Sequence, residues 1–337
     1  MPRRLKMRSM TTWLMSALVL ASGLSAAPAQ SATSCVMSAD EQSWVEGALK
    51  ASDEVMLRRL RLPPDRRPII IVFNDRCRFE SSAGSGWVGT PHRGKIRLPD
   101  GTETDAVITS FASRVGMNGQ RFFVMALPSV WRTGTTIKSD DRLGLTGVFL
   151  HEFSHTRQMD VLQRRFEAAE AVYKMPDDFN DDSIQKRFQS DPAYAASIGQ
   201  EADLLYRAAA EPDSARSRAM ARQALALIEA RQRRWFSGAG ARFKPYDDLF
   251  LTMEGFGQWA AYAWLSDPKG GGMTFAAAQA KMRGSRRWWS QEEGLALFLV
   301  IDRFLPGWAQ RAFGNPPSMG IEMLRQAVEA PPARGLQ

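Results

Sequence analysis

Two of the chain's three histidines lie in one short segment, His151-Glu152-Phe153-Ser154-His155. Residues four apart on an α-helix lie on one face, a turn apart, so both imidazoles can reach a single ion. Zinc binds neutral imidazole nitrogens and, in catalytic sites, keeps a position for water. Glu152 would lie beside that ion, where its carboxylate can take a proton from the water and pass it to a leaving amine. The segment therefore predicts a zinc-dependent hydrolase with His151 and His155 as ligands and Glu152 as general base.

The same pattern has an ordinary structural explanation, in which two surface or core histidines happen to lie beside a helix glutamate. Histidine is rare here, with three in 337 residues, so a chance match to this spacing is on the order of one in several hundred. The segment also lies in an apolar, proline-free stretch that favours a helix. Zinc needs a further ligand, and since no third histidine follows His155 closely, a carboxylate is expected.

A second segment, TMEGFGQW at residues 252–259, bears on that third ligand. Together with HEFSH it resembles the aminopeptidase-N-like gluzincins, a group of zinc metallopeptidases with an N-E-G-F-A helix. The resemblance covers two short stretches, 150–155 and 253–262. It implies a zincin-like fold in which Glu254 is the third zinc ligand. It also implies that Gly255 lets the glutamate helix pack closely on the histidine helix.

The chain departs from the family pattern in two respects. Met253 stands where the family has asparagine, and no G-A-M-E-N segment precedes the histidine helix, so an amine-binding exopeptidase pocket is unsupported. The second histidine and Glu254 are separated by 98 residues, 156–253, which is far more than in the family. A helical insertion must therefore leave the metal centre and return to it, which costs little loop entropy.

Other polar residues could complete the centre. Glu201 and Glu211 are rival carboxylate ligands, and His92 is a further candidate, because ligand type alone does not choose among them. Hydrolysis also needs a donor that stabilises the oxyanion near the metal. Tyr246 and Tyr262 lie nearest in sequence to the proposed glutamate ligand, and His92 could serve too. The spacing does not select one of them.

Helix and strand patterns precede the histidine segment. Apolar spacing predicts a helix over Ser38–Leu60, ended by Pro63-Pro64, and the β-branched run in Pro68–Phe73 predicts a buried strand. Across residues 81–136, glycine and proline separate short segments, which is typical of a small sheet with irregular connections. Within that region, Phe122–Pro128 predicts either an edge strand, to which an extended substrate could add, or a plain core strand.

From Asp140-Asp141 onward the pattern becomes helical. The two aspartates can cap a helix that runs through both metal-ligand histidines toward Tyr173. Apolar periodicity predicts further helices at 220–235, 247–264, 288–304 and 321–328.

These elements predict an α+β fold. A small sheet-containing N-terminal lobe, 30–136, with its edge strand, would pack on a predominantly α-helical, zincin-like lobe, 137–330, with the active-site cleft between them. The helical lobe would carry the insertion at about 160–245. Residues 331–337 would form a loose tail.

The first 29 residues have the layout of a secretory signal peptide. Four basic residues begin the segment, an uncharged apolar run from Trp13 to Leu24 follows, and Ala27-Pro28-Ala29 offers a cleavage site. The apolar run is short for a membrane span, and an uncleaved N-terminal anchor is the alternative. Cleavage near Ala29 would yield an exported protein, periplasmic or secreted.

The charge bears on which partners the protein can bind, and the cysteine content bears on the cellular compartment in which it folds. Removing the four basic residues of the signal lowers the formal net charge from +8 to +4, which gives no case for a nucleic-acid partner. No uninterrupted apolar stretch of transmembrane length follows the signal. Cys35 and Cys77 are expected to form a disulfide in an oxidising compartment, with two buried thiols as the alternative.

Two segments, Arg231–Trp235 and Arg286–Trp289, interleave basic and aromatic residues. Either could make weak contact with anionic envelope surfaces, although a solvated helix face with inward aromatics gives the same pattern. The sequence as a whole favours an exported metallopeptidase that acts on a peptide or protein substrate with Zn²⁺ as cofactor. A binding or scaffold protein with a structural or vestigial zinc site, and a zinc amidase acting on cell-wall peptide, are the alternatives.

Overall fold

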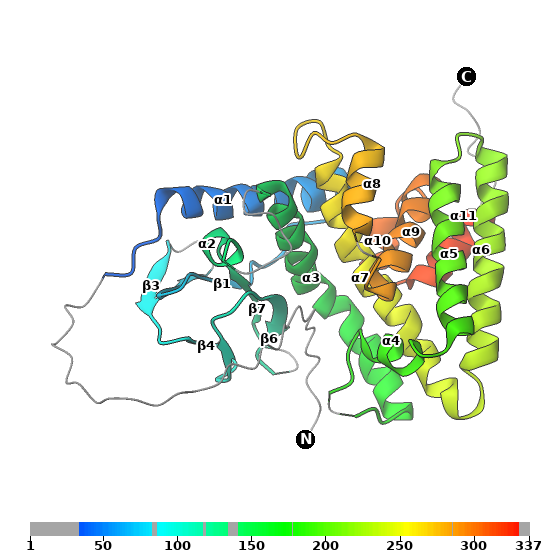
Figure 1. Cartoon of the computed structure of the whole chain (residues 1–337), viewed down its shortest axis with the longest axis horizontal. Helices are drawn as coiled ribbons and strands as arrows, with labels where there is room; N and C mark the ends of the chain where they lie inside the picture. Colours follow the sequence, from blue (N-terminus) through cyan, green and yellow to red (C-terminus); the bar gives the residue numbers. More distant parts are fainter. Residues whose placement is uncertain are drawn as a thin grey trace.

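The molecule combines a small sheet with a larger set of helices (Figure 1). The expected α+β class, with the sheet in the N-terminal part and a helical C-terminal part, is confirmed. In the view of Figure 1, helix α3 lies between the sheet with α1 and α2 on one side and helices α4 to α11 on the other. The expected signal peptide and C-terminal tail lie outside the residues that the computed structural model describes, which are 34–82, 86–116, 119–133, 141–176, 178–284 and 286–329.

The larger sheet has five strands in the order β3-β2-β1-β7-β6, and β4 and β5 form a separate two-stranded sheet. Strands β1 and β7 run parallel, and the other pairs run antiparallel. The first strand confirms the buried strand expected near Pro68. The bounds are β1 (Ile69–Phe73), β2 (Cys77–Ser81), β3 (Val88–Pro91), β4 (Lys95–Arg97), β5 (Glu103–Asp105), β6 (Ser110–Arg114) and β7 (Arg121–Ala126).

The edge-strand prediction for Phe122–Pro128 is wrong, and the core-strand alternative holds. Strand β7 lies between β1 and β6, and all six of its residues are buried. Because both of its sides have a hydrogen-bonded neighbour, it presents no free edge. Pro128 lies beyond the strand, in the first turn of the short helix α2 (Pro128–Trp131), where a missing amide donor needs no compensation. Strand β6 takes the edge position beside β7.

A helix and a disulfide cover the start of the described chain. Helix α1 (Ala39–Asp53) is capped by Ser38 and continues as a π-helix, η1 (Glu54–Arg59), which confirms the helix expected over Ser38–Leu60. The expected Cys35–Cys77 disulfide is present and ties the segment before α1 to strand β2. Closing a loop of 42 residues in this way stabilises the fold by about 3–4 kcal/mol on chain-entropy grounds.

The helical part begins with α3, whose 31 residues make it the longest helix of the described chain. Asp141 caps it, as expected, by accepting a hydrogen bond from the Gly144 amide. The remaining elements are α3 (Arg142–Val172), α4 (Ser183–Phe188), α5 (Pro192–Ala210), α6 (Ser214–Trp235), the 3₁₀-helix η2 (Gly238–Phe243), α7 (Lys244–Leu265), α8 (Phe275–Arg283), α9 (Trp289–Phe304), α10 (Trp308–Ala312) and α11 (Gly320–Glu329). No described helix is both long and apolar enough to cross a membrane.

Two faces of helix α3 contact different parts of the molecule. One face packs on the sheet and α1: the Phe149 ring lies 4.8 Å from the Phe123 ring of β7 and 6.0 Å from the Trp44 ring. The opposite side carries His151 and His155 toward α7. The aromatic contacts fix the rotation of α3 about its axis, so the two histidines are directed away from the sheet.

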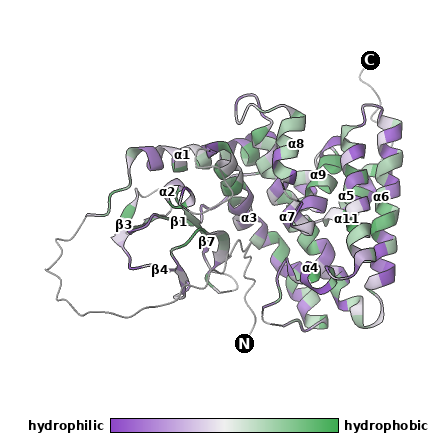
Figure 2. Ribbon diagram, in the orientation of Figure 1, coloured by the Kyte–Doolittle hydropathy of each residue, from purple (hydrophilic) through white to green (hydrophobic). Residues whose placement is uncertain are grey.

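Helix α7 is buried along most of its length, including its polar residues Asp247, Glu254 and Gln258. On the outer helix α6, hydrophilic and hydrophobic residues alternate in Figure 2. Helices α7 and α9 meet closely where Gly255 faces Gly294. A Cβ atom on Gly255 would lie 2.6 Å from the Gly294 carbonyl, and one on Gly294 would lie 2.7 Å from the Gly255 backbone.

Replacing Gly255 with alanine should destabilise the fold by roughly 1–3 kcal/mol, because the new methyl group would meet backbone atoms that cannot rotate away. Gly47→Ala is the matched control, since a Cβ on Gly47, which is also helical, meets no atom within 4 Å. That control should raise the free energy of unfolding by about 0.5–1 kcal/mol through helix propensity. Urea denaturation measures both changes. Equal stability of the two variants would show that the Gly255–Gly294 contact is not tight.

Candidate metal centre

Three side chains predicted as zinc ligands meet inside the helical part. The His151 Nε2 atom lies 3.2 Å from His155 Nε2 and 3.2 Å from Glu254 Oε2, and His155 Nε2 lies 3.6 Å from Glu254 Oε1. Tetrahedral zinc with ligand distances near 2.0–2.1 Å separates its donor atoms by about 3.3 Å. The spacing of the three donor atoms therefore fits one zinc ion among them.

The position of Glu254 follows from the packing of α3 against α7. The helical segment between the histidine pair and Glu254 consists of the second half of α3, then α4, α5 and α6, so α7 returns to lie along α3. The insertion expected at about 160–245 thus begins within the histidine helix itself, which continues to Val172. All three ligand side chains are buried, with His151 at 5% and the other two at 1% exposure.

The glycine that allows the close approach of the histidine and glutamate helices is Gly257, not Gly255 as the resemblance implied. A Cβ atom on Gly257 would lie 2.8 Å from Nδ1 and 2.9 Å from Cε1 of His151. Gly255 instead faces α9 through Gly294. Two residues apart on a helix point about 200° apart, so the two glycines serve opposite neighbours.

Gln158 orients the second histidine. Its Oε1 lies 2.7 Å from Nδ1 of His155, and its Nε2 donates to the Thr252 carbonyl at 3.4 Å. With the amide held in that sense, Nδ1 of His155 carries the proton and donates it to Gln158. The lone pair of Nε2 is then left facing His151 and Glu254, as a metal ligand requires.

A chain of two glutamines orients the carboxylate. Gln291, near the start of α9, donates from Nε2 to Glu254 Oε2 at 3.0 Å. Gln258, one turn after the glutamate on α7, donates to Gln291 Oε1 at 2.8 Å. This chain fixes the plane of the Glu254 carboxylate, which is the role that outer hydrogen bonds have around metal ligands.

The electrostatics keep His155 and Glu254 in forms that bind metal. Burial lowers the pKa of His155 to about 4, with Glu254 opposing the shift and His151 adding to it. Burial alone would raise the pKa of Glu254, but its hydrogen bond to His151 and the charge of both imidazoles lower it to about 2. At neutral pH the His155 imidazole is therefore uncharged and the Glu254 carboxylate is ionised, and these are the forms that bind a metal.

Glu152, the expected general base, directly follows the first histidine on α3 and is 4% exposed. Sequence reasoning missed a second acidic feature, the buried pair Asp181 and Asp182 before α4. Burial raises the pKa of Asp181 well above its usual range, and the nearby charge of Glu254 adds to the shift. Burial also raises the pKa of Asp182 to about 6, with Lys186 opposing it. The acidic composition of residues 175–182 was visible in the sequence, but its proximity to Glu254 was not.

The rival ligands lie in other contacts. Glu201 accepts from Arg231 at 2.7 Å and from Ser197 at 2.6 Å, which occupies its carboxylate in a separate network. Glu211 pairs with Arg216 at 2.9 Å at the end of α5. His92 Nε2 lies 2.9 Å from the Asn74 carbonyl, in the sheet region. None of the three belongs to the donor cluster formed by the described residues.

Neither candidate tyrosine for the oxyanion role is placed at the cluster. Tyr246 donates to the Tyr173 carbonyl at the end of α3, 18 residues and therefore about 27 Å along the helix axis from His155. Tyr262 packs edge-on against Phe275, two turns beyond Glu254. The described contacts assign no side chain to oxyanion stabilisation.

The solvated face that the sequence favoured holds for Arg233, Arg234, Arg286 and Arg287, which are exposed, but not for Arg231. Arg231 is fully buried and bonded to three carboxylates. Arg286 pairs with Asp203 and Glu292 at 2.9 Å each. The guanidinium of Arg231 is therefore not available to an anionic surface.

Comparison with known proteins gave no relative for this chain. No family model matches it, and neither the curated proteins nor the solved structures gave a match. The case for the metal centre consequently depends on the geometry of the three ligands and of the residues that orient them.

Proposed function

We propose that this chain is an exported zinc-dependent metallopeptidase of the gluzincin type. The observation that carries the proposal is the meeting of three side chains: the Nε2 atoms of His151 and His155 lie 3.2 Å apart and 3.2 and 3.6 Å from the two carboxylate oxygens of Glu254. Structural zinc sites usually have four protein ligands, whereas catalytic sites have three and leave one position for water or substrate. The described residues supply three donors, which favours the catalytic kind.

The reaction would use the chain's residues as follows. Zinc, when bound, supplies a Lewis acid that polarises a substrate carbonyl and lowers the pKa of a water molecule. Glu152 takes a proton from the attacking water and delivers it to the leaving amine. Gln158 and Gln291 hold one imidazole and the carboxylate in the orientations in which their lone pairs face the ion.

The resemblance of the HEFSH and MEGFG segments to the gluzincins supports a peptide as the substrate class. Strand β6 lies at the sheet edge and packs against α3, the helix that carries both histidines, but all five of its residues are buried. The sheet edge therefore does not contribute to the choice of substrate. The Cys35–Cys77 disulfide supports export, since such bonds persist in oxidising compartments.

The burial of the ligands favours a second candidate, an exported binding or scaffold protein with a structural zinc. Glu152 and the three ligands are each 5% exposed or less, which limits access of a large substrate to the ion. Metal analysis combined with digestion of casein and of a peptide library separates the candidates. Stoichiometric zinc with cleavage supports the peptidase, and stoichiometric zinc without cleavage in folded protein supports the scaffold. Cleavage restricted to cell-wall peptide would indicate the amidase.

Replacing Gln158 with leucine should weaken zinc binding about 10–100-fold, because Nδ1 of His155 would lose the acceptor that fixes its tautomer. Gln163→Leu is the matched control: this buried glutamine lies on the same helix and, within the described part of the chain, its side chain donates to Glu167. Competition against a chromophoric chelator measures both affinities. Equal zinc affinities in the two variants would contradict the role given to Gln158.

A further inference from the structure

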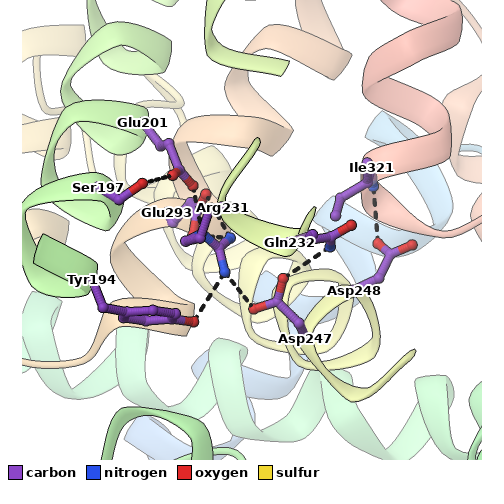
Figure 3. Close-up of polar contacts among 9 residues, drawn as sticks. All are labelled: Tyr194, Ser197, Glu201, Arg231, Gln232, Asp247, Asp248, Glu293 and Ile321. Atoms are coloured by element: carbon purple, nitrogen blue, oxygen red, sulfur yellow. Dashed lines mark hydrogen bonds and ion pairs between the residues drawn. The ribbon is translucent and has the colours of Figure 1, made fainter. Parts of the chain in front are cut away.

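Arg231 lies at the centre of a buried polar network that joins four helices (Figure 3). Its guanidinium is fully buried on α6. The Nε atom contacts Glu201 of α5 at 2.7 Å, and Nη1 contacts Asp247 of α7 at 3.0 Å. Nη2 lies 3.4 Å from Glu293 of α9, and the Tyr194 hydroxyl of α5 lies 3.0 Å from Nη1. One side chain of the insertion is thus bonded to three other helices.

Two of these helices carry the metal centre. Asp247 precedes Glu254 on α7 by seven residues, or about two helical turns. Glu293 follows Gln291 on α9 by two residues, and Gln291 is the donor to the Glu254 carboxylate. Gly255 directly follows Glu254 on α7, Gly294 directly follows Glu293 on α9, and the two glycines are in contact. Arg231 therefore holds α7 and α9 close to the point where they present Glu254 and its hydrogen-bond donor.

A small cavity of about 20 Å³ separates the network from the loop before α4. Tyr194, Asp247 and Glu293 line it together with Asp181 and Ser290, the neighbour of Gln291 in sequence. The cavity thus brings the network residues together with the loop before α4 and with the start of α9, where Gln291 lies.

Stability alone is a weak reason for such a network. Burying an arginine with its partners costs desolvation free energy that often equals the attraction gained, and apolar side chains of similar volume are often as stabilising. A planar guanidinium that bonds several carboxylates does fix the relative positions of the helices that bear them. Apolar packing tolerates small shifts between helices, whereas several directed hydrogen bonds to one group do not.

We propose that Arg231 is a positioning residue of the metal centre: it sets the register of α7 and α9, so that Glu254 and Gln291 meet the two histidines of α3. This inference rests on the proposed zinc site. The helical insertion separates the histidines from the glutamate in sequence. Under this proposal, one of its residues also helps to hold the glutamate in place beside them.

The test compares Arg231→Met and Arg231→Lys with a control on the same helix. Arg218 is also buried, but it bonds the Ala327 carbonyl of α11 and stacks on Phe304, at the end of α9 remote from Gln291. Zinc affinity is measured by chelator competition on protein that circular dichroism shows to be folded. The absorption spectrum of the cobalt-substituted protein reports the ligand geometry, which a loss of stability alone would leave unchanged.

We expect Arg231→Met to weaken zinc binding about tenfold or more and to alter the cobalt spectrum, in line with outer residues of metal sites. Arg231→Lys should restore part of the affinity, since lysine keeps the positive charge but lacks the planar set of guanidinium donors. Arg218→Met should lower the melting temperature without changing zinc affinity. If Arg231→Met is less stable but binds zinc as tightly as the wild type, Arg231 serves folding alone and the inference is wrong.

A second variant covers the case in which Arg231→Met does not fold. Asp247→Asn removes the charge that links Arg231 to α7 while keeping an acceptor for Gln232. We expect it to weaken zinc binding in the same direction, and unchanged affinity would overturn the proposal. A wild-type protein that binds no zinc would instead refute the proposed function. The zinc affinity of the wild type is therefore measured before that of any variant.

Discussion

Glu152→Gln should lower peptide cleavage by about 10²–10⁴-fold while leaving zinc bound, because general-base catalysis by a positioned carboxylate contributes rate factors of that size. The amide keeps the shape of the side chain but cannot accept a proton from the attacking water. Glu152 is not one of the three donors of the cluster, so its replacement leaves the ligand set complete. Turnover of a fluorogenic peptide and the zinc content of the same preparation measure the two effects together.

Glu167→Gln is the control for this experiment. Glu167 lies on the same helix, beyond both histidines, and accepts a hydrogen bond from Gln163 at 2.9 Å. Its replacement should change neither cleavage nor zinc content. Peptidase activity retained by Glu152→Gln would show that another group acts as the base, and the assignment of Glu152 would have to be withdrawn.

Glu254→Gln should weaken zinc binding by more than about 100-fold, beyond the 10–100-fold range expected for outer-shell substitutions. The change removes an anionic ligand, and it places an amide against the Gln291 side chain that donates to Glu254 Oε2. Chelator competition at neutral pH measures the affinity, and circular dichroism establishes that the variant is folded.

Glu211→Gln provides the comparison. Glu211 was one of the two rival carboxylate ligands, and it forms an ion pair with Arg216 away from the histidines. The zinc affinity of this variant should equal that of the wild type. An unchanged affinity in Glu254→Gln, or a loss in Glu211→Gln comparable to that expected for Glu254→Gln, would mean that the third ligand has been assigned to the wrong carboxylate.

Local sequence patterns were sufficient for several of the elements and for two of the three side chains in the cluster. The spacing of His151 and His155 is a property of a single helix, so their meeting requires only that α3 form. The same holds for the buried strand β1 and for the capping of α3 by Asp141, which are both local features. The Cys35–Cys77 pairing followed from there being two cysteines in the chain.

The position of Glu254 beside the histidines depended on tertiary packing. With 98 residues between His155 and Glu254, no local rule states which carboxylate returns to the histidines. The short resemblance around Glu254 selected it, yet it placed the close helix contact at Gly255 when Gly257 makes it. The rotation of α7 about its axis decides this, and the rotation is set by packing on α3 and α9 together.

Polar residues with tertiary roles were the least visible in the sequence. Gln158 and Gln291 are ordinary helix residues until their partners are known. Arg231 lies among other arginines on α6, where amphipathicity predicts a solvated face, and its burial depends on carboxylates from three other helices. Strand β7 was ambiguous for a related reason, because a strand's place in a sheet is set by pairing with distant segments.

The most direct test of the account is the zinc content of the purified protein, measured by atomic spectrometry after removal of loosely bound metal. The wild type should hold one zinc ion per chain, and a His151→Ala, His155→Ala double variant that remains folded should hold none. A folded wild-type protein without zinc, or a double variant that keeps the metal, would contradict the central claim that these two imidazoles and Glu254 share one ion.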